Sequence, residues 1–92
     1  MIKTFRSKAL RLFAESGDAS KLSVANRNRV EIILRALDAA SRPEDMNVPG
    51  LFFHSLKGKE KGRYSVRASG NWRITFGWDG TDAVDIDLED YH

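Results

Sequence analysis

The sequence contains no cysteine, only two prolines and no long apolar run. Without cysteine, the chain cannot carry a disulfide scaffold, a thiolate zinc site or a cysteine nucleophile. A membrane helix needs about 18 or more consecutive apolar residues, and residues 1–5 do not begin a signal peptide. We therefore expect a cytoplasmic protein that makes no contact with a membrane.

The length and composition are typical of one ordinary globular domain. The 92 residues are 41% hydrophobic and 30% charged, so we predict a single domain over residues 1–92. Residues 1–73 carry all 15 Lys and Arg, whereas residues 74–92 carry six of the 13 acidic residues and no Lys or Arg. This asymmetry indicates a polyanionic partner for the basic part. The alternative is that acidic and basic strands neutralise each other within one sheet.

Two helices are expected in the N-terminal half. Ser7 is a candidate N-cap and Gly17 a candidate C-cap of the first helix. Ser23 is a candidate N-cap of the second helix, which should end before Pro43. The buried face of the second helix is predicted from apolar residues at helical spacing. These are Val30, Ile33, Leu34 and Leu37.

From residue 51 onward the hydrophobic period changes from that of a helix to that of a strand. Four alternating segments have predicted core positions at Phe52, His54 and Leu56; at Tyr64, Val66 and Ala68; at Trp72, Ile74, Phe76 and Trp78; and at Val84, Ile86 and Leu88. In this pattern His54 is expected to be partly buried. Together with a short strand at residues 2–5, the pattern predicts an α+β fold. Two N-terminal helices would pack on one face of an antiparallel sheet of four or five strands.

Arg67 and Arg73 are expected to face each other on the surface opposite the core. A three-residue loop at 69–71 would set Ala68 opposite Trp72 and Arg67 opposite Arg73, with the Cβ atoms of the two arginines about 5 Å apart. Opposed like charges are unfavourable unless an anion lies between them, and two guanidinium groups suit the oxygens of a phosphate. The alternative is that acidic residues of the next strand neutralise both arginines. These are Asp85, Asp87 and Glu89.

The segment 57–73 holds six cations, one acid and interleaved aromatic residues, a pattern typical of surfaces that bind single-stranded RNA. The cations are Lys57, Lys59, Lys61, Arg63, Arg67 and Arg73. The alternation of side chains along the strands places Tyr64 and Trp72 in the core, which leaves Tyr91 as the candidate for base stacking. His92 carries an imidazole that can act near neutral pH as a general acid or base. No spacing of His, Asp or Glu is typical of a metal site, so we expect neither a metal nor another cofactor.

Three motifs carry a resemblance to a known family: LKG at 56–58, SVRASGNWRITF at 65–76 and DYH at 90–92. With them, the sequence resembles the HigB toxins of bacterial type II toxin–antitoxin modules, within the RelE/ParE superfamily, over nearly the whole chain. It departs from the family at Ser55 and Lys59, where proline and an acidic residue are frequent. The resemblance implies the RelE/ParE-like fold of microbial RNases. It also implies a metal-independent endoribonuclease that cleaves mRNA on translating ribosomes.

The resemblance also implies roles for individual residues. His92 would be the general acid or base, and Asp90 and Tyr91 would orient it and the substrate. Lys57, Arg67 and Arg73 would stabilise the charge on a pentavalent phosphorane. The implied partners are a HigA-type helix-turn-helix antitoxin, the ribosome and mRNA, with operator DNA bound only through the antitoxin. The alternatives are a ParE-like inhibitor of DNA gyrase that cleaves no RNA, and an inactive module that binds only its antitoxin.

Overall fold

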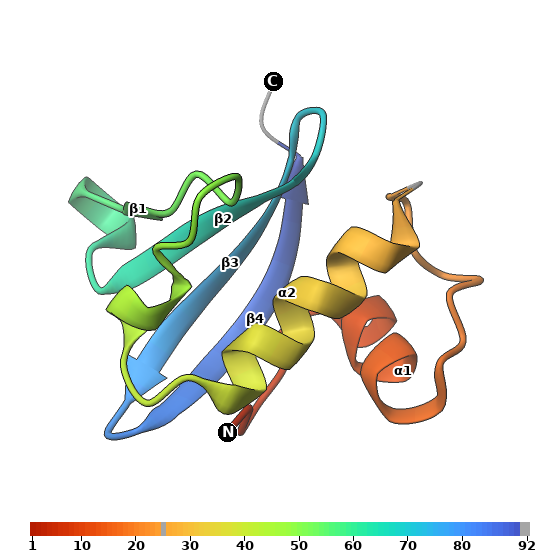
Figure 1. The fold of residues 1–92 in the computed structure, drawn as a ribbon, viewed down its shortest axis with the longest axis horizontal. Helices are drawn as coiled ribbons and strands as arrows, with labels where there is room; N and C mark the ends of the chain where they lie inside the picture. The colour runs from red at the N-terminus through yellow and green to blue at the C-terminus, as the bar shows by residue number, and fades with distance from the viewer. Residues whose placement is uncertain (25, 91–92) are drawn as a thin grey trace.

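The computed structural model describes residues 1–24 and 26–90. Helices α1 (Lys8–Ser16) and α2 (Arg27–Ala39) lie on one side of a four-stranded antiparallel sheet in the order β1-β2-β3-β4 (Figure 1). The strands are β1 (His54–Ser55), β2 (Arg63–Ser69), β3 (Trp72–Asp79) and β4 (Asp82–Asp90), and the connections contain the 3-10 helices η1 (Pro43–Met46) and η2 (Gly58–Glu60). The predicted α+β class is confirmed. None of the described helices has the length and apolarity needed to cross a membrane.

The N-terminal segment lies along the edge of β4. Ile2 and Phe5 form isolated parallel bridges with Ala83 and Ile86, and the backbone N–H of Lys3 donates to the Ala83 carbonyl at 2.8 Å. The segment at residues 2–5 therefore protects part of the β4 edge, as a short additional strand would.

The caps of α1 are those that the sequence predicts, whereas α2 begins later than predicted. Ser7 accepts a hydrogen bond from the Leu10 N–H, and Gly17 ends α1 with a φ of 75°. The N-cap of α2 is Asn26, whose side chain accepts from the Arg29 N–H at 3.1 Å, so the prediction of Ser23 is wrong. The reason is that Val24, only 3% exposed, packs into the core ahead of the first helical turn.

The core lies between the helices and the inner face of the sheet. The predicted face of α2 is buried, and Val66, Ile74 and Phe76 are fully buried beneath it. A row of aromatic rings extends along the sheet, since Tyr64 stacks on Phe53 and on Phe76 with centroid distances of 5.7 Å in both pairs. Both Tyr64 and Trp72 pack against the core, as the alternation of side chains predicts.

A β-bulge at Ala68 changes the predicted connection between β2 and β3. Ser69, not Ala68, pairs with Trp72, and the turn contains only Gly70 and Asn71. The extra residue in β2 keeps the fully buried Ala68 in the core and leaves Arg67 opposite Arg73. The predicted opposition of the two arginines is confirmed, and the three-residue loop is wrong. Gly70 adopts the positive φ of 55° that the short turn needs.

A second bulge, at Asp85, places Val84 on the outer face. The register changes from Thr75 opposite Asp87 to Gly77 opposite Val84, and Asp85 has a φ of 51°. Ala83, which is fully buried, therefore takes the core position predicted for Val84. Aspartate tolerates this left-handed conformation better than most residues. Here Thr4 fixes it, because its hydroxyl accepts from the Asp85 N–H at 2.8 Å.

The side chains of residues 52–54 point to the faces of the sheet opposite to those predicted. Phe53 packs against the core, whereas Phe52 and His54 are exposed, so the prediction of a partly buried His54 is wrong. The left-handed backbone at Phe52, with a φ of 53°, ends the regular alternation before β1. This inversion brings His54 to the outer face.

The capping arrangement predicts different effects of two similar substitutions. Replacing Asn26 by alanine removes the acceptor for the Arg29 N–H and should lower the free energy of unfolding by about 1 kcal/mol. The matched Ser23→Ala change removes no cap and should alter stability by less than about 0.5 kcal/mol. Urea unfolding of both variants checks this. Equal losses would show that Ser23 is the cap.

Candidate active site

The outer face of the sheet, away from the helices, carries two rows of side chains. In the first row, Arg67 pairs with Arg73 and Arg73 pairs with Glu89. The second row follows the same registers one pleat further along. It consists of His54, Ser65, Thr75 and Asp87. Residues opposite each other in antiparallel strands share a face, so both rows lie on the outer face, where Ser65 and Thr75 are buried at 2% and 0% exposure.

Arg67 lies opposite Arg73 on this face and is half-buried. Its Nε donates to the Gly70 carbonyl at 3.2 Å, and its guanidinium carbon lies 5.4 Å from the centroid of the Phe52 ring. Among residues 1–24 and 26–90, no carboxylate forms an ion pair with Arg67. The positive charge of Arg67, directly opposite that of Arg73, therefore remains available to an anion.

The acidic strand β4 does not supply that anion. Its three acidic residues make their hydrogen bonds elsewhere: Glu89 with the hydroxyl of Thr75, Asp87 with the backbone N–H of Leu88 and Asp85 with Thr4. The bulge at Asp85 displaces that residue from the alternation on which the neutralisation alternative depends. Within the described part of the chain, this alternative is wrong for Arg67.

Three lysines follow β1 along the chain, in and next to η2. Lys57 precedes η2 in an extended conformation, Lys59 lies within η2, and Lys61 follows it. All three are exposed. Because η2 connects β1 to β2, these cations lie at the β1 edge of the sheet.

Arg63, the fourth cation of this segment, is built into the fold. Its side chain is only 11% exposed and lies 3.6 Å from the Glu60 carboxylate. Its guanidinium donates to the Thr75 hydroxyl at 3.0 Å and to the Asp85 carbonyl at 2.8 Å. Arg63 therefore links β2, β3 and the bulge of β4, and we assign it a structural role in place of the predicted contact with RNA.

His54 is a candidate that sequence analysis missed. It pairs with Ser65, the residue two positions before Arg67, and its side chain is exposed on the same face. Diagonal neighbours on adjacent antiparallel strands are about 7–8 Å apart. The arrangement thus places an exposed imidazole beside Arg67. The sequence signal for the exposure of His54 is the doublet Phe52-Phe53, because only one of two adjacent phenylalanines in a strand can point into the core.

The predicted C-terminal contributors are only partly described. Strand β4 ends at Asp90, which pairs with Trp72 at the end of the sheet nearest the β2–β3 turn. Tyr91 and His92 lie outside the described residues. Within the described ranges, no group of three or more His, Asp or Glu is placed to hold a metal ion.

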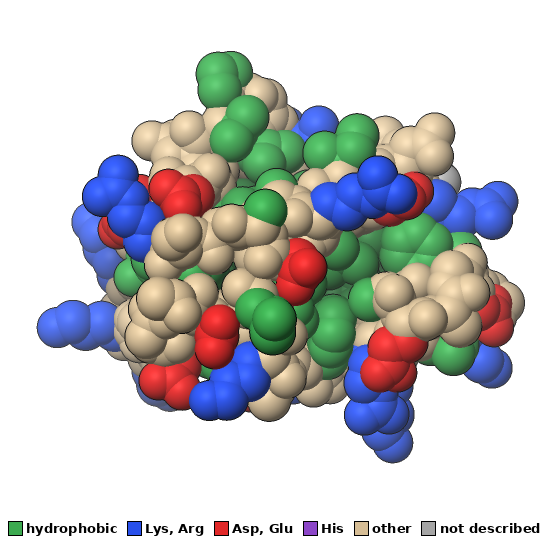
Figure 2. Space-filling model, turned by 60° about the horizontal axis from the view of Figure 1, so that its bottom comes forward, with side chains coloured by type: hydrophobic (Ala, Val, Ile, Leu, Met, Phe, Trp, Pro, Cys, Tyr) green, Lys and Arg blue, Asp and Glu red, His purple; other side chains and the backbone are tan. Residues whose placement is uncertain are grey.

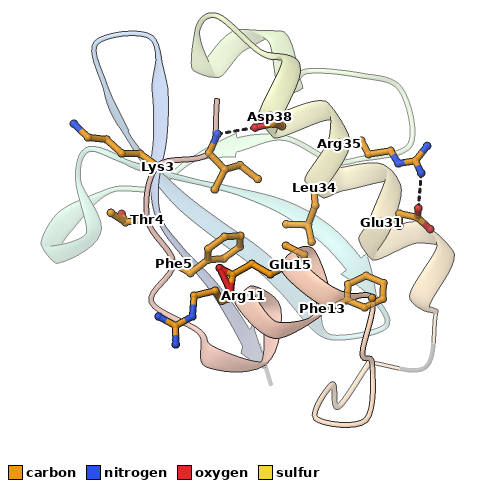
Figure 3. A pocket seen from close by; sticks show the side chains of 13 residues that line it. Lys3, Thr4, Phe5, Arg11, Phe13, Glu15, Glu31, Leu34, Arg35 and Asp38 are labelled. Carbon is orange, nitrogen blue, oxygen red and sulfur yellow. Dashed lines mark hydrogen bonds and ion pairs between the residues drawn. The ribbon is translucent and has the colours of Figure 1, made fainter.

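A hollow lies on the helical side of the molecule, between α1, α2 and the N-terminal segment (Figures 2 and 3). Its volume is about 890 Å³, and its apolar lining includes Phe5, Phe13 and Leu34. Charged side chains stand around it, among them Arg35, which bonds Glu31 at 2.7 Å (Figure 3). None of the predicted site residues up to Asp90 lines this groove.

Two comparisons with known proteins agree. A family model described as the RelE-like toxin of the type II toxin–antitoxin system HigB matches residues 3–92. Endoribonuclease HigB of Proteus vulgaris is 37% identical over 92 residues, which are 100% of both chains.

The structural role of Arg63 predicts a loss of stability that the exposed cations do not share. Arg63→Met leaves the Thr75 hydroxyl and the Asp85 carbonyl without their charged donor and should lower the free energy of unfolding by about 1.5–3 kcal/mol. Lys61→Met, at an exposed position, should change it by less than about 0.5 kcal/mol. Urea unfolding checks both, and an unchanged stability of the Arg63 variant would contradict the assignment.

Proposed function

Since the chain belongs to the HigB-like toxin family of type II toxin–antitoxin systems, we propose that it is an endoribonuclease that cleaves mRNA on the translating ribosome and thereby inhibits translation. The observation that carries this proposal is the arginine pair. Arg67 and Arg73 oppose each other on an outward surface, and Arg67 has no carboxylate partner within the described chain.

The proposed reaction uses the RNA's own 2′-hydroxyl as nucleophile. A general base removes the proton of the 2′-hydroxyl, and its oxygen forms a bond to the adjacent phosphorus. The bond from phosphorus to the 5′-oxygen of the next nucleotide then breaks, and a general acid protonates that leaving oxygen. The products are a 2′,3′-cyclic phosphate and a 5′-hydroxyl. The phosphorane between these steps carries extra negative charge, which opposed guanidinium groups stabilise.

Two imidazoles are proposed for the proton transfers. His54 is exposed on the outer face beside Arg67, and His92 follows two residues after Asp90 at the end of β4. An imidazole can exchange a proton near neutral pH, so one can act as base and the other as acid. Asp90 and Tyr91 are proposed to position His92 and the substrate.

The exposed lysines extend the site along the RNA. Lys57 is proposed to join the arginine pair in stabilising the phosphorane, and Lys59 and Lys61 to bind neighbouring phosphates. Tyr91 remains the proposed stacking residue of the C-terminal segment. This surface lies on the face of the sheet that the helices leave open, so a strand of RNA can reach it without rearrangement of the core.

A toxin of a type II toxin–antitoxin system has an antitoxin partner. We propose that this partner is a HigA-type helix-turn-helix protein and that operator DNA is bound through it. With mRNA on ribosomes as the substrate, the proposed place of action is the cytoplasm.

Loss of one arginine of the pair should reduce cleavage strongly. Arg73→Ala should slow cleavage of ribosome-bound mRNA by at least about 100-fold, as removal of one oxyanion donor does. Arg35→Ala, on the exposed side of α2, removes a cation of the helical side and should leave the rate unchanged. A native rate in the Arg73 variant would exclude this phosphate site.

The two proposed histidines predict a change in pH dependence. The rate should fall at low pH, where the base is protonated, and at high pH, where the acid has lost its proton. His54→Ala and His92→Gln should each slow cleavage by about 100-fold or more and remove one limb of that profile. Residual cleavage by both variants with two unchanged limbs would contradict the assignment. Gyrase-dependent DNA cleavage by the native protein, with intact mRNA, would instead indicate a ParE-like inhibitor.

A further inference from the structure

We propose that Phe52 is a stacking platform for a nucleobase next to the arginine pair, a role that rests on the proposed function. Among the described residues, Phe52 is the only aromatic in the group of large hydrophobic side chains that stand exposed, at 55%. Its backbone φ of 53° belongs to the left-handed region that phenylalanine rarely adopts. An exposed aromatic ring in a strained conformation contributes little to stability, which points to a functional use.

Both neighbours of Phe52 are fixed to the fold, so the outward position of its ring is built in. Leu51 is buried, and its carbonyl accepts from the Arg67 N–H at 2.7 Å. Phe53 stacks on Tyr64 with an angle of 11° between the rings. Between these two anchors, the left-handed residue turns its side chain to the other face.

Helix α2 holds this segment from the side. Arg29 donates from Nε to the Arg67 carbonyl at 3.0 Å, and its Nη2 donates to the Gly50 carbonyl. One guanidinium thus ties the backbone before Phe52 to the strand that carries Arg67. The distance between the ring and the proposed phosphate site is therefore set by the fold.

The environment of the ring suits a base rather than an apolar partner. The guanidinium of Arg67 lies over the ring, 5.4 Å from its centroid, while more than half of the side chain remains in solvent. Bases stack on aromatic rings and on guanidinium planes with little dependence on sequence. A nucleotide whose phosphate binds between Arg67 and Arg73 would therefore have its own or the adjacent base within reach of Phe52.

The test measures the affinity of the full chain for two short single strands with 2′-O-methyl groups, which prevent cleavage. One strand carries its bases and the other is fully abasic. Phe52→Leu keeps a bulky apolar residue in the same strained backbone but cannot stack, and Phe52→Trp restores a ring. The Leu variant should bind the base-bearing strand roughly 5- to 150-fold more weakly. The Trp variant should match the native protein, and all three should bind the abasic strand equally.

Equal affinity of the native and Leu proteins for the base-bearing strand would overturn the inference and leave the proposed function intact. So would an equal loss for both strands, which would place Phe52 in the positioning of the backbone. A native protein that binds neither strand and cleaves no mRNA would overturn both proposals. Loss of antitoxin binding alone in the Leu variant would make Phe52 part of a protein interface.

A stability measurement separates a functional ring from a structural one. Phe52→Gly removes the strain of the positive φ, so its melting temperature should equal or exceed that of the native protein. Its affinity for the base-bearing strand should fall as that of the Leu variant does. A lower melting temperature together with weaker binding would assign the ring to the fold and overturn the inference.

Discussion

The register between β2 and β3 is the constraint on which the rest of the site depends. It sets two guanidinium groups opposite each other on the outer face of the sheet, where like charges repel. The sheet accepts this cost because the inner face of the same strands buries Val66, Ile74 and Phe76 completely. A shift of one residue would turn those three side chains to solvent, so burial on one face enforces the charge pair on the other.

The surroundings of Arg67 leave its charge without a carboxylate partner among the described residues. The carboxylates of the acidic strand β4 bond to Thr75, to their own backbone and to Thr4, and Arg63, on the same outer face, donates to the Thr75 hydroxyl. Arg29 of α2 connects the helix to β2, because its Nε donates to the Arg67 carbonyl. Two cations, Arg29 of α2 and Arg63 of β2, therefore hold the sheet. Arg67 instead lies against the Phe52 ring, and Lys57, Lys59 and Lys61 are exposed.

Sequence patterns predict most of the fold and the centre of the site. Hydrophobic periodicity predicts the buried face of α2 and the inner faces of β2 and β3, because the buried residues of these elements recur at nearly constant spacing. It fails at Asp85, where a single extra residue reverses the facing of Val84, whereas the bulge at Ala68 changes the length of the loop and leaves Ala68 in the core as predicted. Bulges leave no periodic signal, and the one at Asp85 depends on Thr4, 81 positions away in sequence. The exposure of His54 depends on the left-handed backbone at Phe52, for which the doublet Phe52-Phe53 is the one signal in the sequence.

The most direct test of this account is a crystal structure of the protein with a non-cleavable RNA strand that carries 2′-O-methyl groups. We expect one phosphate of the strand within hydrogen-bond distance of both the Arg67 and the Arg73 guanidinium groups, on the face of the sheet away from the helices. A strand bound elsewhere, with both guanidinium groups engaged by carboxylates of the protein, would contradict it.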